Sequence, residues 1–267
     1  MSDPLHVVVL VKQVPDTYSE RRLREEDWTL DRDATDPVID EIDTRGVEAG
    51  LQLVEEHGGE VTVLTMGPER ATEALRKALA MGAARAVHVQ DDRLAGACAL
   101  QTSVALAAAL RTLAPDLVIT GNESTDGRTG SLPSMLAERL GVPQITSAKA
   151  LRLDAATRSL SAERVHDSGV TEVTATLPAV VSVNEKTNEP RYPNFKGIMS
   201  AKKKPVSVLG LDDLEVDPAR FGTGATSTTV LAGAPRPARA AGETLTDDGQ
   251  GNSVATVVEH LVAGRLL

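Results

Sequence analysis

The chain has 267 residues, 41% of them hydrophobic, which is enough for one sizeable α/β domain with appended segments. Its net charge of −10 opposes binding to a phosphate backbone, and two Phe, two Tyr and one Trp offer few rings for stacking bases, so no nucleic acid is expected as a partner. A core built mainly from Val, Leu, Ile and Ala suits a parallel sheet covered by Ala-rich helices.

The first half of the chain alternates buried strands with helices. Residues 6–11 are an unbroken apolar run, typical of a strand buried on both faces of a sheet, and a polar excursion without periodicity follows at 16–36. In chain order we expect strands at 6–11, 60–66, 85–90 and 116–120, and helices at 44–57, 67–82, 98–113 and 132–140. This alternation predicts right-handed βαβ crossovers and a mainly parallel, doubly wound sheet with a Rossmann-like nucleotide-binding core.

The pattern changes after Ile145. Short strands separated by turn residues predict antiparallel hairpins, followed by an apolar segment that returns to the sheet; they lie at 148–153, 159–165, 170–177 and 179–184. Periodicity is lost from Asp212 onward and recovers a helical pattern only at 253–262. We therefore expect an α/β domain at 1–204 and an extended C-terminal arm at 205–267, which buries too little to fold alone and packs on a partner.

Residue types and spacings exclude several kinds of site. Cys98 is the single cysteine, which excludes a disulfide framework and a cysteine-rich metal site, and the five histidines lack ligand spacing, so no metal is expected. Neither a G-x-S-x-G elbow nor an H-E-x-x-H helix is present, so we expect no catalytic residues. No apolar run approaches the roughly 20 residues of a membrane helix. Because the first strand leaves no room for a signal peptide, we expect a cytoplasmic protein without membrane insertion.

The segments after the predicted strands are the candidate ligand positions, because a doubly wound sheet binds ligands beyond the carboxyl ends of its strands. They begin at Val11, at Met66 and at Gly121, where the loop 121–130 reads G-N-E-S-T-D-G-R-T-G. This loop is neither a Walker loop nor a G-x-G-x-x-G motif. Its backbone amides, placed before a helix, can hold a phosphate, although its turn-forming residues also suit a solvated loop. The acidic segment 40–43 either supplies a helix N-cap or meets a ribose or base.

One segment has a composition that no structural rule predicts. Residues 184–204 read N-E-K-T-N-E-P-R-Y-P-N-F-K-G-I-M-S-A-K-K-K, with an aromatic pair in an aromatic-poor chain and a final run of lysines. A surface loop with a basic helix end is one interpretation. Exposed apolar side chains framed by charge are also typical of a docking site for another protein.

Several motifs together resemble electron-transfer flavoprotein beta subunits. The most specific is N-E-P-R-Y-P-x-x-x-G-I-M-x-A-K-K-K, which ends at Lys204. Further motifs match in order: V-K-Q-V-P-D-T, G-P-x-x-A-x-x-x-L-R-K-A-L-A-M-G-A, G-N-E-S-T-D-G, L-A-E-R-L-G-x-P-Q and L-P-A-V-V-S-V-N-E. The resemblance covers nearly the whole chain. It implies a heterodimer with an alpha subunit that holds most of a FAD, AMP in a beta-subunit pocket, and electron transfer from acyl-CoA dehydrogenases and related flavoenzymes to a quinone reductase.

The resemblance also assigns two sets of residues. The nucleotide pocket comprises Leu10, Val11, Asp40, Glu41, Ile42, Asp43, Met66, Gly121, Asn122, Glu123, Ser124, Thr125, Asp126, Gly127, Arg128, Thr129, Gly130, Ser131 and Leu132. The partner-docking set within the recognition loop 184–204 comprises Arg191, Tyr192, Phe195, Ile198, Met199, Lys202, Lys203 and Lys204. Phe195 takes the place of the family's apolar anchor, commonly Leu, and the basic residues are expected to steer acidic partners.

Two departures from the family's pattern limit what carries over. The pocket loop continues as Ser131-Leu132-Pro133 where relatives often have Gln-Val/Thr-Gly, and Val165 stands where some relatives have an acid close to the flavin. Three other functions stay open at this point: an electron-bifurcating member with a second FAD in the beta pocket, a free-standing adenine-nucleotide-binding regulator of the stress-protein kind, and a nucleotide-dependent transferase or ligase. The long C-terminal arm argues against the regulator, and the missing catalytic residues argue against the transferase or ligase.

Overall fold

A computed structural model describes residues 4–235, 237, 241–242, 244–247 and 249–267. The chain divides into two compact units, the first ending at Gly233 and the second beginning at Ala234. Each unit is described by itself.

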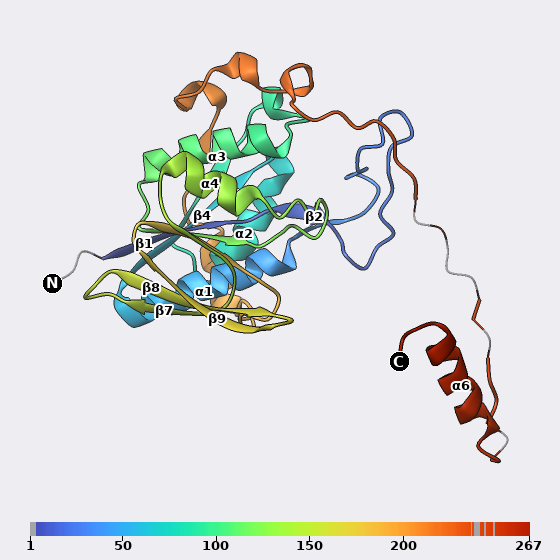
Figure 1. Cartoon of the computed structure of the whole chain (residues 1–267). Helices are drawn as coiled ribbons and strands as arrows, with labels where there is room; N and C mark the ends of the chain where they lie inside the picture. Colours follow the sequence, from blue (N-terminus) through green and yellow to red (C-terminus); the bar gives the residue numbers. More distant parts are fainter. Residues whose placement is uncertain (1–3, 236, 238–240, 243, 248) are drawn as a thin grey trace. The chain divides into compact units, whose positions relative to one another are not determined.

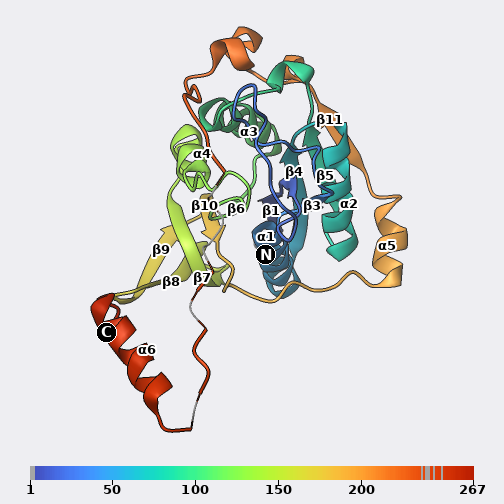
Figure 2. The same ribbon diagram turned by 90° about the vertical axis from the view of Figure 1, so that its right-hand side faces the viewer.

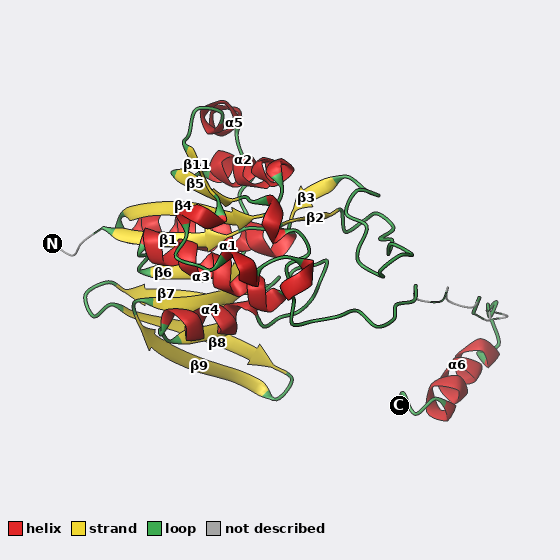
Figure 3. Ribbon diagram, turned by 90° about the horizontal axis from the view of Figure 1, so that it is seen from above, coloured by secondary structure: helices red, strands yellow, loops and turns green. Residues whose placement is uncertain are grey.

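The first unit is built on a nine-stranded sheet with the order β11-β5-β4-β1-β6-β10-β7-β8-β9 (Figures 1 and 3). Its strands are β1 Leu5–Leu10, β4 Gly59–Met66, β5 Arg85–Val89, β6 Leu117–Gly121, β7 Gln144–Asp154, β8 Ser159–His166, β9 Gly169–Thr176, β10 Ala179–Val183 and β11 Val206–Leu209. The strands from β11 to β7 pair in parallel, whereas β7, β8 and β9 pair antiparallel. The predicted mainly parallel sheet with an antiparallel hairpin region is confirmed.

Helices cover both faces of the sheet, as the doubly wound prediction requires (Figure 2). On one face the core includes Val7 and Val9 of β1 with Leu51 and Leu75 of the helices α1 Glu41–His57 and α2 Thr72–Met81. On the other face Val8 packs in one cluster with side chains of α3 Ala99–Leu113 and α4 Leu132–Leu140. Strand β1 therefore buries successive residues on opposite sides, which explains its unbroken apolar sequence.

Small residues let the first helix lie close to the sheet. A Cβ atom at Gly50 would come within 3.0 Å of Val9 Cγ2 and 3.3 Å of Val7 Cγ1, and one at Gly46 within 3.4 Å of Val9 Cγ1. These positions permit a close approach between helix and strand, so a core with few aromatic side chains can still be densely packed.

The compact unit extends further along the chain than the domain boundary predicted at 204. Strand β11 adds to the sheet edge beside β5, and Leu211, Leu214 and Phe221 are buried in the second core cluster. Segment 205–233 therefore belongs to the first unit because its apolar side chains complete that core. The signal for this strand is the segment Val206–Leu209, which reads V-S-V-L with two β-branched valines, and the surrounding loss of periodicity conceals it.

The polar excursion and the docking segment contain elements that periodicity did not predict. Strands β2 Gln13–Pro15 and β3 Pro37–Ile39 form a two-stranded antiparallel sheet at the base of the excursion, and a bridge joins Leu23 to Leu30 within it. The short helix α5 Phe195–Ala201 lies beside α2 (Figure 2).

The second unit contains the helix α6 Asn252–Ala263, close to the helical segment predicted at 253–262. Its apolar residues recur at helical spacing along one face, and within this structure most of them are exposed. They are Val254, Val257, Val258, Leu261 and Val262.

Candidate functional site

The chain reverses its direction across the sheet between β1 and β6. From β1 it runs outward through β4 and β5, and β6 then lies on the other side of β1. The loops after β1 and β6 therefore leave the same sheet edge on either side of a topological switch point, where doubly wound proteins bind ligands. All the predicted pocket residues lie at the carboxyl ends of β1, β4 and β6, in the loop after β6, or in the first turns of α1 and α4.

Two buried carboxylates hold this edge together. Asp40 is the N-cap of α1, as one interpretation of segment 40–43 predicted, and its Oδ1 accepts a hydrogen bond from Ile42 N at 2.9 Å. Its Oδ2 accepts bonds from the backbone N and the hydroxyl of Thr125 at 2.7 and 2.8 Å. Asp40 thus fastens the loop after β6 to the start of α1.

Asp43 makes the corresponding link to the strands. Its Oδ2 accepts a hydrogen bond from Lys12 N at 2.7 Å and its Oδ1 accepts one from Gly121 N at 3.3 Å. Burial raises the pKa of Asp43 well above its usual value, and the nearby Asp40 adds to the rise. A Cβ atom at Gly121 would lie 2.7 Å from Asp43 Oδ1, so only glycine lets the strand end approach this carboxylate. Asp40 and Asp43 therefore shape the pocket instead of extending freely into it.

A group of basic side chains surrounds the middle of the loop after β6. Lys12 Nζ lies 2.8 Å from Asp126 Oδ1 and 3.2 Å from Ser124 Oγ, and Arg32 Nη1 lies 2.6 Å from Asp126 Oδ2. Arg21 Nη1 donates to the carbonyl oxygen of Thr125. Although burial alone would raise the pKa of Asp126, the charges of Lys12 and Arg32 hold it well below its usual range. None of the three basic residues belonged to the predicted pocket, although Lys12 directly follows the first strand and two arginines lie in the polar excursion.

Buried polar atoms in this region fit an anionic nucleotide. Within the described part of the chain, Arg21 Nε, Arg21 Nη2 and Asn122 Oδ1 are buried without a hydrogen-bond partner. Buried polar groups normally find partners, and those left without one mark a place where a ligand or water completes the structure. The donors of Arg21 suit a phosphate, and the amide of Asn122 suits a hydroxyl or an amino group.

The remaining pocket residues lie along the same edge with different exposure. Leu10, Val11 and Ile42 are buried in the core, whereas Glu41 and the glycine-flanked stretch 127–130 are exposed. Arg128 and Gly130 adopt positive φ values of 48° and 67°, which turn the loop towards α4. Val165, the second departure from the family's pattern, lies on β8, where it pairs with Val170 of β9.

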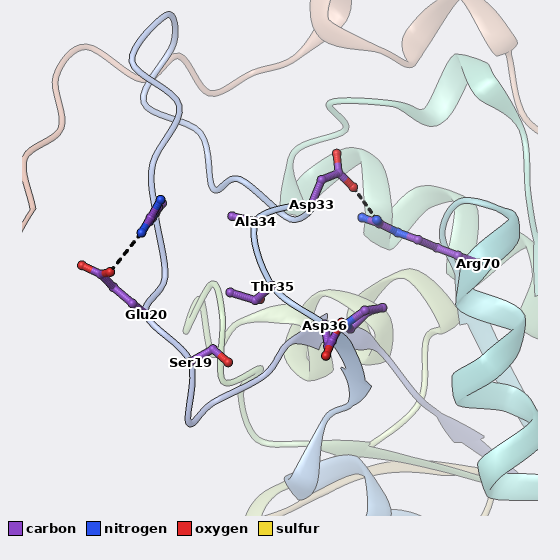
Figure 4. Close-up of a pocket in the computed structure, with 9 residues that line it drawn as sticks. Ser19, Glu20, Asp33, Ala34, Thr35, Asp36 and Arg70 are labelled. Atoms are coloured by element: carbon purple, nitrogen blue, oxygen red, sulfur yellow. Dashed lines mark hydrogen bonds and ion pairs between the residues drawn. The ribbon is translucent and has the colours of Figure 1, made fainter.

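A polar cavity of about 680 Å³ lies within the excursion (Figure 4). Its walls carry the ion pairs Glu20–Arg22 and Asp33–Arg70, together with residues 34–37 and Ser19. None of the predicted cofactor-binding residues lines this cavity.

The predicted docking residues divide into two kinds. Tyr192 and Phe195 are 97% and 79% exposed, and Ile198 and Met199 are each 47% exposed. Lys202 and Lys203 are also exposed. By contrast, the charged groups of Arg191 and Lys204 form hydrogen bonds with other residues of this chain.

Arg191 clamps the docking segment to α1. Its Nε and Nη2 donate to Glu48 at 2.7 and 3.0 Å, and its Nη1 and Nη2 donate to Glu55 at 2.5 and 3.0 Å. At the other end of the segment, Lys204 Nζ donates to the carbonyl oxygens of Leu79 and Ala83 at 2.9 and 2.6 Å, where α2 ends.

The helices α2 and α5 also enclose an apolar groove of about 640 Å³, lined by Tyr192, Pro193, Ile198, Ala201, Ala80 and the basic residues Arg76, Lys77 and Lys202. Gly197 permits the close contact between the helices, since its Cβ would lie 2.5 Å from Ala80 O. The pocket lies where α2 begins and the docking segment where it ends, so the two sets of residues occupy opposite ends of that helix.

The fold and the strand-end site place the chain among doubly wound α/β proteins of the ligand-binding kind. Residues 27–214 match the model of the electron transfer flavoprotein domain. The chain is 52% identical to the electron transfer flavoprotein subunit beta of Mycobacterium tuberculosis, covering 98% of this chain and 99% of that protein. It is 51% identical to the corresponding subunit of Mycobacterium leprae, covering 98% of this chain and 99% of that protein. It is 36% identical to that of Thermoanaerobacterium thermosaccharolyticum, covering 96% of this chain and 98% of that protein. The chain belongs to the electron transfer flavoprotein beta subunit family, whose members are electron carriers.

Among the residues that the structure describes, no helix combines the length and the apolar character that crossing a membrane requires.

Proposed function

We propose that this chain is the beta subunit of a heterodimeric electron-transfer flavoprotein that operates in the cytoplasm. It receives electrons from acyl-CoA dehydrogenases and related flavoenzymes and passes them, through a FAD held mostly by the alpha subunit, to a quinone reductase. The observation that carries the proposal is the anchored docking segment: Tyr192 and Phe195 are almost fully exposed, in a chain with few aromatic residues. Large aromatic side chains exposed on a protein surface are candidates for interface hot spots.

The same proposal assigns the strand-end site to AMP, with a second FAD in its place if the protein bifurcates electrons. Loop 121–132, the first turn of α1, and the ends of β1 and β4 would hold the nucleotide. The flavin, when bound, supplies the redox chemistry, while the protein contributes binding, orientation and electrostatics. This chain therefore needs no acid, base or nucleophile of its own.

Electrostatics support a transient encounter at the docking segment. Lys202 and Lys203 are exposed beside the apolar side chains, on a chain whose net charge is −10. A local basic patch on an acidic protein orients it towards acidic partner surfaces and raises the association rate at low salt.

The test is to coexpress the chain with its alpha subunit and to analyse the purified complex. A yellow 1:1 complex that releases one FAD and one AMP on denaturation supports the simple carrier, whereas two FAD support bifurcation. A colourless monomer that ignores the alpha subunit would contradict the proposal.

Replacing the anchor tests the docking role in the same complex. Phe195→Ala is expected to slow reduction by an acyl-CoA dehydrogenase by about 30-fold, the effect of losing a hot spot worth about 2 kcal/mol, with flavin content unchanged. Tyr18→Ala is the matched control, because Tyr18 is 94% exposed outside the docking segment. Loss of flavin in Phe195→Ala would instead assign the segment a structural role.

A further inference from the structure

Three basic side chains converge on a few residues of the loop after β6. Lys12, at the end of β1, reaches Ser124 and Asp126; Arg32 reaches Asp126 and Arg21 reaches the carbonyl oxygen of Thr125. Both arginines come from the excursion between β2 and β3, whose pairing from Gln13↔Ile39 to Pro15↔Pro37 fixes its base. Residues distant in sequence therefore bring their charges to one place.

The charges at this place do not balance. Lys12 and Arg32 share the single carboxylate of Asp126, and Arg21 forms no ion pair with any described residue. These three cations lie near two carboxylates, that of Asp126 and that of Asp40, which binds Thr125, so one positive charge remains in excess although the chain as a whole is acidic.

Arg21 is the clearest sign of a missing partner. Its Nε and Nη2 are buried without a hydrogen bond to the described part of the chain, while its Nη1 is held by Thr125. A guanidinium cannot lose its proton near neutral pH, so the penalty for burying unpaired donors cannot be avoided by neutralisation. An anion that accepts from two guanidinium nitrogens would remove this penalty, and phosphate oxygens have the matching geometry.

We propose that Lys12, Arg21 and Arg32 form an anion site beside residues 124–126, and that this site binds the phosphate group of a nucleotide seated at the strand ends. The proposal rests on the nucleotide-binding function proposed above and extends it to side chains of the polar excursion. A phosphate monoester carries a charge of about −1.5 to −2 at neutral pH, which offsets the excess positive charge of this cluster.

The site gives the excursion a role in ligand binding. Arg21 and Arg32 lie on either side of the bridge between Leu23 and Leu30. A phosphate bound by both would join the excursion to loop 121–131, so occupancy of the pocket and order in the excursion would be coupled.

The experiment uses the nucleotide-free heterodimer and three variants: Arg21→Gln, Arg32→Gln and the control Arg24→Gln. Arg24 lies in the same excursion, and its exposed side chain forms an ion pair with Asp33, at 3.5 Å, and with no other residue that the structure describes. Calorimetric titration with AMP and with adenosine isolates the phosphate, because the two ligands share base and ribose. We expect Arg21→Gln to weaken AMP binding by about 10- to 100-fold, the effect of one or two charged hydrogen bonds, with adenosine unchanged. Arg24→Gln should bind both ligands as the unmodified complex does.

Thermal unfolding separates a ligand-binding role from a structural one. Without nucleotide, Arg21→Gln should unfold at the same temperature as the unmodified complex or higher, because it removes a buried unpaired charge. Two results would overturn the anion site. The first is a lower unfolding temperature for Arg21→Gln than for the unmodified complex, both without nucleotide. The second is equal affinity of the two for AMP when the unmodified complex binds AMP more tightly than adenosine.

A third ligand distinguishes failure of this site from failure of the nucleotide function. If the unmodified complex binds no adenine nucleotide, inorganic phosphate becomes the probe. If phosphate raises the unfolding temperature of the unmodified complex but not that of Arg21→Gln, the result would support the anion site and contradict the nucleotide-binding function. Absence of stabilisation would overturn both.

Discussion

Asp40 and Asp43 begin α1 and, between them, accept backbone hydrogen bonds from Lys12, Ile42, Gly121 and Thr125. The segment after β1, the first turn of α1 and the segment from the end of β6 into its loop thus meet at two buried carboxylates. The N-cap role of Asp40 could be predicted because capping depends on local sequence. The bonds from Thr125 and Gly121 could not, since they require knowing that β1 and β6 are neighbours in the sheet.

The pKa of the Cys98 thiol could not be predicted from the sequence alone. Cys98 is the N-cap residue of α3, and the backbone N–H groups of Gln101 and Ser227 point towards its sulfur. Burial opposes the thiolate, but these donors outweigh it and lower the pKa of Cys98 to about 7. The contact from Ser227 depends on the return of the chain after β11.

The lowered pKa predicts how Cys98 reacts. Alkylation by iodoacetamide, followed by mass spectrometry on this single cysteine, should rise with pH around a midpoint of about 7. The pKa of Cys98 in the folded protein lies below the value of about 8.5 for an unfolded chain. The thiolate therefore stabilises the fold at pH values above about 8.5, and this stabilisation is lost as the pH falls through the folded pKa. A midpoint near that of an ordinary thiol would contradict the assignment.

At the scale of elements, the buried parallel strands and their helices were predictable because their patterns are local. Strand β1 and α2 show this, one by its apolar run and the other by Ala74, Leu75, Ala78 and Leu79 on one face. Strand β11 and helix α5 were not predicted. The first is only four residues at a sheet edge, and the second is seven residues that include a glycine and lie against α2. Such elements owe their conformation to the surface on which they pack.

Arg191 is expected to position the docking segment instead of attracting the partner. Arg191→Gln should raise the KM for the dehydrogenase several-fold while flavin content and the salt dependence of the rate stay unchanged, because its charge is already paired with Glu48 and Glu55. Lys203→Gln is the matched control and should weaken the salt dependence, since Lys203 is exposed. If both variants changed the salt dependence of the rate equally, Arg191 would attract the acidic partner as Lys203 does.

The same ion pairs predict the effect of acid on the clamp. Burial alone would raise the pKa of Glu48, but hydrogen bonds from Arg191 outweigh it and lower the value; hydrogen bonds from Arg191 also lower that of Glu55. Their stabilisation is therefore present above the ordinary glutamate pKa of about 4.3 and is lost as pH falls through the lowered folded values. In Arg191→Gln this acid dependence should disappear.

At the scale of the whole molecule, the core ends within the first unit. Among the residues that the structure describes, Phe221 is the last in either buried cluster. The second unit contributes a helix whose five apolar side chains, from Val254 to Val262, belong to no buried cluster formed by the residues that the structure describes. An amphipathic helix of this kind gains stability mainly by packing its apolar face. We propose that the alpha subunit provides the surface against which this face packs.

A pair of substitutions in the full chain tests this role of α6. Val258 lies near the middle of the apolar face, so Val258→Glu would place a charge against the partner and lose about 2 kcal/mol of apolar burial, weakening the heterodimer by roughly 30-fold or more. Thr256→Glu introduces the same charge on the opposite face and should leave the subunit dissociation constant nearly unchanged. Sedimentation of the two complexes at decreasing concentration measures the difference. Equal dissociation of both variants would mean that the apolar face of α6 meets no partner, and that the arm serves another purpose than holding the subunits together.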